Sequence, residues 1–242
     1  MFAFDFSRFR GADDKRPPYR PELAGKNRTG GTGNLMRKGE ETRTRILDVA
    51  ETAVLQKGFG GTSIEELIAE TGITKSGFFY HFRDKNALAK ALLERYIEND
   101  ERIYDEIFTR ARELTEDPLQ SFMLGLKLLA ELLSDLPNGH PGCLVATVCY
   151  YERLFDRDIQ EINKQAVLAW RRRFRGMFEE IMVVYTPREP IEIDQLADMV
   201  STVLEGGIVL SKALKEPQGL ADQVLVLRSF VKLLFQPQIV RQ

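Results

Sequence analysis

The sequence has few of the features that mark secreted or membrane-embedded proteins. It contains 2 cysteines, Cys143 and Cys149, which are too few for a disulfide framework. No run of about 18 uncharged apolar residues occurs, so we expect no membrane-spanning helix. Residues 1–20 alternate aromatic and charged side chains and lack the continuous apolar stretch of a secretory signal. These absences predict a cytoplasmic protein with no membrane partner.

The sequence is equally poor in the patterns that carry catalysis or bind metals. It has 2 histidines, and His140 and Cys149 are too isolated to form a metal site. The cluster at residues 30–33 has no preceding strand and no Gly-Lys-Ser/Thr ending, so it is not a phosphate-binding loop. No nucleophile, base and acid occur in a recognisable arrangement. We therefore expect no catalytic residue, no metal and no cofactor, and no enzymatic activity.

The charge of the chain is close to balanced. The formal net charge is -2 and the sequence pI is about 5.9, so a nucleic-acid partner would have to be held by a local basic patch. Residues 1–39 are rich in glycine, proline and basic residues and predict a flexible basic arm. This arm is either a natural segment able to reach DNA phosphates or a sequence added upstream of a start at Met36.

Beyond Glu40, a helical periodicity replaces the arm composition, and hardly any stretch alternates as a strand would. We predict an all-α protein of about nine helices, with a domain at 40–86 and a larger helical domain at 87–242. The first helix is expected at 41–57, and the next begins at Thr62 and Ser63, each followed three residues later by glutamate. Residues 194–215 and 220–235 are expected to form the last two helices.

Residues 58–88 contain the pattern that carries function, and they read GFGGTSIEELIAETGITKSGFFYHFRDKNAL. A helix, a turn with Gly72 and a short second helix follow in the order that a helix-turn-helix requires. Thr74, Lys75, Ser76 and Gly77 open the second helix with small or hydrogen-bonding groups suited to the major groove. Tyr80, His81 and Lys85 could reach phosphates, although His81 could instead be structural, and Phe78, Phe79 and Phe82 are expected mainly in the core.

This stretch resembles the DNA-binding domain of the TetR family of regulators, which runs through Gly-Ile/Val-Ser/Thr-Lys-x-x-aromatic-Tyr-x-His-Phe. The resemblance covers about Arg43 to Leu92. Phe79 is a departure, because relatives often carry tyrosine there. The resemblance implies a DNA-facing set: Thr62, Ser63, Thr74, Lys75, Ser76, Gly77, Tyr80, His81 and Lys85.

The resemblance further implies a homodimer formed by the last two helices and a ligand pocket in the second domain. It indicates a repressor that a small molecule releases from a double-stranded, palindromic operator; activation and a pure protein-interaction role are the alternatives. The dimerisation candidates are Val203, Gly206, Gly207, Leu210, Leu227 and Val231. The pocket candidates, which are also ordinary helix core, are Phe122, Leu126, Cys143, Thr147, Tyr151, Trp170 and Phe174.

Cys143 has two possible roles at this stage. It stands at the start of a predicted helix, where the helix N-terminus can lower a thiol pKa and make a redox or electrophile sensor. Packing in a buried site is the commoner role of a cytosolic cysteine. The arginine-rich segment 171–175 is expected to be a solvated or interdomain helix face, because its side chains point in several directions around a helix.

Overall fold

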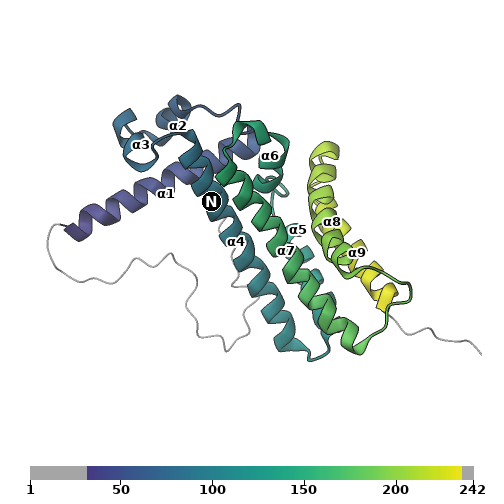
Figure 1. Cartoon of the computed structure of the whole chain (residues 1–242). Coiled ribbons are helices and arrows are strands. Elements are labelled where there is room, and N and C mark those ends of the chain that lie inside the picture. The colour runs from purple at the N-terminus through teal and green to yellow at the C-terminus, as the bar shows by residue number, and fades with distance from the viewer. Residues whose placement is uncertain (1–31, 236–242) are drawn as a thin grey trace, which may run out of the picture.

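A computed structural model describes the backbone of residues 32–235, with side chains from Lys38 onward. In this part of the chain there are nine α-helices, one short 3-10 helix and no strand (Figure 1), which confirms the predicted all-helical fold. The helices are α1 (Thr32–Lys57), α2 (Ile64–Thr71), α3 (Lys75–His81), α4 (Lys85–Leu114), α5 (Pro118–Ser134), α6 (Leu144–Tyr150), η2 (Glu152–Leu154), α7 (Arg157–Val184), α8 (Ile193–Leu214) and α9 (Gly219–Phe235).

The first helix begins earlier than the sequence pattern predicts. We expected it at Glu41, but α1 begins at Thr32, so residues 32–39 are helical and do not belong to a flexible arm. Glycine weakens a helix mainly through backbone entropy, and a β-carbon added to Gly39 would meet nothing within 4 Å. The good helix formers Leu35, Met36 and Lys38 offset that cost. Residues 1–31, the rest of the predicted arm, lie outside the described residues.

Helices α1 to α3 share a core with the first turns of α4. The side chains of Ile46, Leu67, Phe78 and Leu88 are buried together there. Three helix starts are capped by side chains: Ser63, Thr74 and Asp84 each accept a hydrogen bond from the backbone N–H three residues later. Gly72 ends α2 with φ 66°, a left-handed conformation that glycine adopts without steric cost.

The second core lies among α5, α7, α8, α9 and the later turns of α4. Helix α5 packs against α9 and α4, and α8 packs against α7 and α9. Apolar residues fill nearly the whole circumference of α5, as its sequence predicts, and Phe122 and Leu126 are buried. None of the described helices is both long and apolar enough to span a membrane.

Helix α4 and the segment around η2 join the two cores. Helix α4 gives Leu88 and Leu92 to the first core and Ile107 and Phe108 to the second. Beside it, the rings of Phe59 and Phe155 lie with centroids 4.8 Å apart. The larger helical body therefore holds the loop between α1 and α2, which leads directly into the helix-turn-helix.

Candidate nucleic-acid interface

Helix α3 separates its side chains into a buried and an exposed face. Phe78 is fully buried, and its ring packs edge-on against Phe79 at 5.5 Å. Lys75, Ser76 and Tyr80 are exposed, and Tyr80 is 83% exposed. An aromatic side chain left so exposed on a short helix is available to a partner. The three core phenylalanines expected from the sequence divide accordingly: Phe78 and Phe82 are buried, while Phe79 is 41% exposed.

The N-terminus of α3 is arranged by Thr74. Its hydroxyl oxygen accepts a hydrogen bond from Gly77 N–H at 3.0 Å and lies 3.1 Å from Ser76 Oγ. A β-carbon at Gly77 would lie 3.2 Å from that hydroxyl, so glycine leaves room for the cap. The other first-turn N–H groups have no acceptor within the helix, which makes this end a natural site for an anionic or hydrogen-bond-accepting surface.

Two residues of the expected DNA-facing set have structural roles instead. Thr62 is only 2% exposed, and its hydroxyl donates to the Gly58 carbonyl at 3.0 Å. The cap of α2 is Ser63, which stays exposed at the surface. Lys85 donates to the Phe59 carbonyl at 2.6 Å, and burial lowers the pKa of its ammonium group. Thr62 therefore leaves the candidate set, and Lys85 is first of all a support for the loop before α2.

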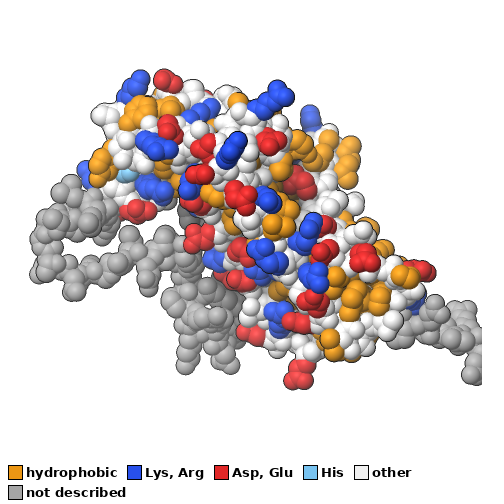
Figure 2. Space-filling view, viewed as in Figure 1, with side chains coloured by type: hydrophobic (Ala, Val, Ile, Leu, Met, Phe, Trp, Pro, Cys, Tyr) orange, Lys and Arg blue, Asp and Glu red, His pale blue; other side chains and the backbone are white. Residues whose placement is uncertain are grey.

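The remaining members come from the N-cap of α2 and from α3 with its cap. Ser63 and Lys75 are exposed, while His81 is half-buried with its ring 5.0 Å from that of Tyr80. Their contact with DNA stays a prediction. Figure 2 shows acidic and basic side chains interspersed over this end of the molecule, so net charge alone does not mark the DNA-facing surface.

The expected ligand-pocket residues lie in different surroundings, and their role in ligand binding stays a prediction. Phe122, Leu126 and Phe174 are packed in the core, since each is at most 2% exposed. Tyr151 is 48% exposed and lies against Gly58. Thr147 donates to the Cys143 carbonyl, and Cys143 and Trp170 lie where the two cores meet. Phe122 also lines a pocket of about 230 Å³ between α4, α5 and α7.

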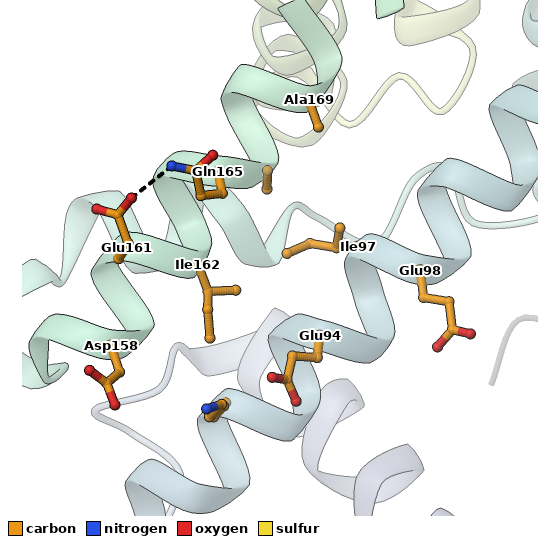
Figure 3. Close-up of a pocket in the computed structure, with 10 residues that line it drawn as sticks. Glu94, Ile97, Glu98, Asp158, Glu161, Ile162, Gln165 and Ala169 are labelled. Carbon is orange, nitrogen blue, oxygen red and sulfur yellow. Dashed lines mark hydrogen bonds between the residues drawn. The ribbon is translucent and has the colours of Figure 1, made fainter. Parts of the chain in front are cut away.

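A larger groove lies elsewhere, between α4 and α7, and has a volume of about 580 Å³. Figure 3 shows Ile97 and Ile162 pointing toward one another across it, with carboxylate side chains around this apolar centre. Sequence reasoning missed this groove because its walls come from two helices distant in the chain. The lining residues are Lys90, Glu94, Ile97, Glu98, Asp158, Glu161, Ile162, Gln165, Ala166 and Ala169.

Helix α4 carries three ionisable side chains, four residues apart, whose pKa values are raised. Burial first, and then the charges of Glu101 and Glu51, raise the pKa of Asp100 to about 7. Burial also raises the pKa values of Tyr96 and Tyr104 well above the usual value. The indole N–H of Trp170 is buried and has no acceptor among the described residues.

The thiol of Cys143 belongs to the same region. It caps α6 by accepting from Ala146 N–H at 3.4 Å, which lowers its pKa, but burial has the larger effect and raises the pKa to about 12. Of the two roles considered for Cys143, this environment favours packing in a buried site over an activated thiol, because burial raises its pKa. Among the described residues, no group of three or more His, Cys, Asp or Glu side chains could hold a metal ion.

Helices α8 and α9 lie together at one side of the molecule (Figure 1), and Figure 2 shows hydrophobic side chains exposed on that side. Gly206 and Leu210, two of the expected dimerisation residues, lie exposed, and Val203 is half-buried. Gly207, Leu227 and Val231 are buried within the chain and are removed from that set. The exposed apolar side chains that sequence reasoning missed are Val209, Leu214, Leu225, Val226, Phe230 and Leu233.

Comparison with known proteins gives a consistent result. Residues 46–92 match the family described as "Bacterial regulatory proteins, tetR family". The "Probable HTH-type transcriptional regulator ArpR" of Pseudomonas putida is 27% identical over 128 residues, which cover 53% of this chain and 58% of that protein. The matched region thus spans little more than half of that relative. YxaF of Bacillus subtilis, an HTH-type transcriptional regulator, is 23% identical over 196 residues, covering 77% of this chain and 95% of YxaF.

Solved structures show the same fold. A TetR-family transcriptional regulator from Agrobacterium tumefaciens aligns with a TM-score of 0.68 and 15% identity, covering 82% of this chain and 100% of that structure. Escherichia coli NemR in its reduced form aligns with a TM-score of 0.65 and 18% identity, covering 82% of this chain and 100% of NemR.

Proposed function

The chain belongs to the TetR family of DNA-binding transcriptional regulators, and from this premise we propose that it is a homodimeric repressor that leaves a palindromic operator when a small molecule binds. A regulator of this kind acts where the DNA is, in the cytoplasm. The observation that carries the proposal is the α3 surface, where Lys75, Ser76 and Tyr80 are exposed around a capped helix N-terminus and above the buried Phe78.

The chemistry of α3 suits a duplex. A short helix can enter the major groove with its N-terminus first, where hydroxyl and ammonium groups meet base edges. Lys75 and Ser76 occupy that position, and Tyr80 follows one turn later, where its phenol can donate to a phosphate. Ser63 at the start of α2 supplies a second hydroxyl that could contact the DNA phosphate backbone.

The proposed dimer rests on the apolar face of α8 and α9. Val226 is 60% exposed and Leu233 is 59% exposed on α9, and Leu214 is 59% exposed on α8. Several exposed apolar side chains on adjacent helices are typical of a protein interface. A twofold pair packed through this face would present two α3 helices to successive major grooves, which lie about 34 to 36 Å apart.

Release by a small molecule requires an effector that binds better to the state in which the two α3 helices are wrongly spaced for DNA. Helix α4 is the natural connection, because its early turns lie in the core of the helix-turn-helix and its later turns in the larger core. A shift of α4 therefore moves the DNA-binding unit with it.

The test is selection of duplexes from a random pool by the full chain and by the Lys75→Ala/Tyr80→Ala variant. Enrichment of a palindrome by the unmutated protein alone is expected, with an affinity loss of about 10- to 100-fold for the variant on the selected site. The matched control is Tyr150→Ala, because Tyr150 is 74% exposed but stands on α6. Failure of a folded, dimeric protein to enrich any sequence would overturn the proposal.

A further inference from the structure

The groove between α4 and α7 combines an apolar floor with an acidic rim. Ile97 of α4 and Ile162, Ala166 and Ala169 of α7 supply the floor. Burying an apolar surface of this kind against a ligand is favourable, at roughly 25 cal/mol per Å² of area. The volume of about 580 Å³ lies inside the range of about 300 to 1,000 Å³ that small-molecule sites occupy.

The charges around the groove are predominantly negative. Glu94, Glu98, Asp158 and Glu161 line it, against the single ammonium of Lys90. Glu161 accepts a hydrogen bond from Gln165 at 2.7 Å and lies 3.9 Å from Lys164. In the part of the chain that the structure describes, none of the other three carboxylates makes an ion pair. A cleft lined by one sign of charge over an apolar floor attracts the opposite charge.

Two further polar side chains stand on the same helices, near the groove residues in sequence. Asp100, three residues beyond Ile97 on α4, is partly buried, and no cation is among the groups that shift its pKa. Trp170, the residue after Ala169, has a buried indole N–H without an acceptor.

The length of the groove limits what can fill it. From Lys90 to Glu98 the helix rises roughly 12 Å, since each residue adds about 1.5 Å. This length fits a short apolar body with one charged end and is too short for a docked helix of ordinary length.

We propose that the α4–α7 groove binds organic cations with an apolar body, such as alkylammonium compounds, with the body on Ile97 and Ile162 and the cation beside Glu94 and Asp158. An ammonium that is fully alkylated needs no hydrogen-bond acceptor, so four rim carboxylates and an apolar floor satisfy it. The same groove offers an anionic amphiphile the ammonium of Lys90 alone among its lining residues, against four carboxylates.

Occupation of this groove would act on the DNA-binding unit. Lys90 follows Leu88 by two residues, and Leu88 is buried in the core of the helix-turn-helix together with Ala166 of α7. A ligand between α4 and α7 would move the two helices apart, and both helices contribute side chains to the core of the helix-turn-helix. Organic cations would then be the effectors of the proposed repressor. This effector role rests on the proposed function, but the binding of cations in the groove does not.

The first experiment measures binding without DNA. Isothermal titration calorimetry of the full chain with decyltrimethylammonium, below its critical micelle concentration, is expected to give one saturable site, and decyl sulfate is expected to give none. Glu94→Gln/Asp158→Asn is expected to weaken binding about tenfold or more, which corresponds to about 1.4 kcal/mol. Glu189→Gln/Asp222→Asn, which removes the same charge from other surfaces, is the matched control and keeps the affinity.

Three outcomes would overturn the proposal: equal binding of both amphiphiles, equal weakening by both double variants, or an Ala169→Leu variant that fills the groove and still binds with unchanged affinity. A fourth is binding that occurs only after residues 1–31 are deleted, since the groove would then belong to the chain's own basic segment. Circular dichroism melting of each variant separates loss of binding from loss of folding.

The second experiment adds the selected operator. If decyltrimethylammonium binds and also releases the operator, with the same dependence on Glu94 and Asp158, both proposals stand. Binding without release leaves the site intact and overturns its role as the effector site. Failure to find an operator counts against the proposed function and leaves the calorimetric result unaffected.

Discussion

The ammonium of Lys85 donates a hydrogen bond to the carbonyl oxygen of Phe59 at 2.6 Å and lies 4.7 Å from the centre of the same residue's ring. This contact joins the first turn of α4 to the loop that leads into α2. Burial lowers the pKa of the ammonium, in keeping with its partly buried position. It fixes the loop from which the DNA-facing surface is built.

Replacing this lysine should therefore affect stability before it affects DNA binding. Lys85→Met removes the donor and leaves a partly buried carbonyl without its partner, which is expected to lower the free energy of unfolding by about 1 to 3 kcal/mol. Urea unfolding followed by circular dichroism measures the change. Lys90→Met, an exposed lysine on the same helix, is the control. If both variants unfold like the parent, the Lys85–Phe59 contact contributes nothing to stability.

Two helical glycines should respond oppositely to alanine. A β-carbon at Gly125 would lie 2.4 Å from Phe108 Cε1, so Gly125→Ala forces α5 away from α4 and should lower stability by about 1 to 3 kcal/mol. At Gly176 a β-carbon would meet nothing within 4 Å, and Gly176→Ala should raise stability by up to about 1 kcal/mol. Thermal melts compare the two, and a loss of stability in Gly176→Ala would contradict the packing described for α7.

A charge on the apolar face of α9 should separate the proposed dimer into folded monomers. Val226→Glu places a carboxylate on a side chain that is 60% exposed, so the single chain tolerates it while an apolar interface does not. Sedimentation equilibrium should show a rise in the dimer dissociation constant of at least 100-fold. Val183→Glu, at a position 87% exposed near the end of α7, should leave the dimer unchanged. Equal effects of both variants would remove α9 from the interface.

Asp100 should make stability depend on pH. Its pKa is about 7 in the folded chain against an ordinary value of 3.8, so the folded state keeps the proton over an interval in which the unfolded state has lost it. The contribution of Asp100 to stability is therefore largest at low pH and falls as pH rises from about 4 to about 7. Between pH 5 and pH 8 the fall is about 3 kcal/mol.

Asp100→Asn should remove this dependence. Asparagine has nearly the same shape and no charge, so the difference in unfolding free energy between variant and parent should favour the variant increasingly up to pH 8. Urea unfolding at pH 5, 6, 7 and 8 gives the comparison, with the exposed Asp222→Asn as the control. A parallel pH profile for all three proteins would mean that Asp100 ionises as it does in the unfolded chain.

The sequence predicts the helix-turn-helix well because local chemistry marks every one of its boundaries. Ser63, Thr74 and Asp84 are caps, and Gly72 supplies a left-handed backbone, so each helix start or stop depends on residues within three positions of it. The first helix is the exception. Gly33 and Gly39 suggested a flexible segment, but neither prevents helix formation where the surrounding residues favour it.

The larger domain is harder to predict because both faces of its last helices are apolar. Leu227 and Val231 were expected at a dimer interface, yet they fill the core beneath α9, and Val226 and Phe230, one residue before each, are exposed. An amphipathic pattern distinguishes inside from outside only when the outside is polar. The groove shows the same limit, since its walls stand at least 60 residues apart on α4 and α7 and no local motif indicates that they meet.

Helix α4 has 30 residues and takes part in both cores, so a tilt of this helix in one core would displace the part that lies in the other. Its length is roughly 45 Å at about 1.5 Å per residue, and a tilt of 5° about one end would carry the other through roughly 4 Å. A movement of that size is comparable to the rise from one base pair to the next. A displacement of less than 1 Å near one end of a long helix would thus become a shift of several ångströms at the other end. Such a shift would change which base pairs α3 can reach in the DNA major groove.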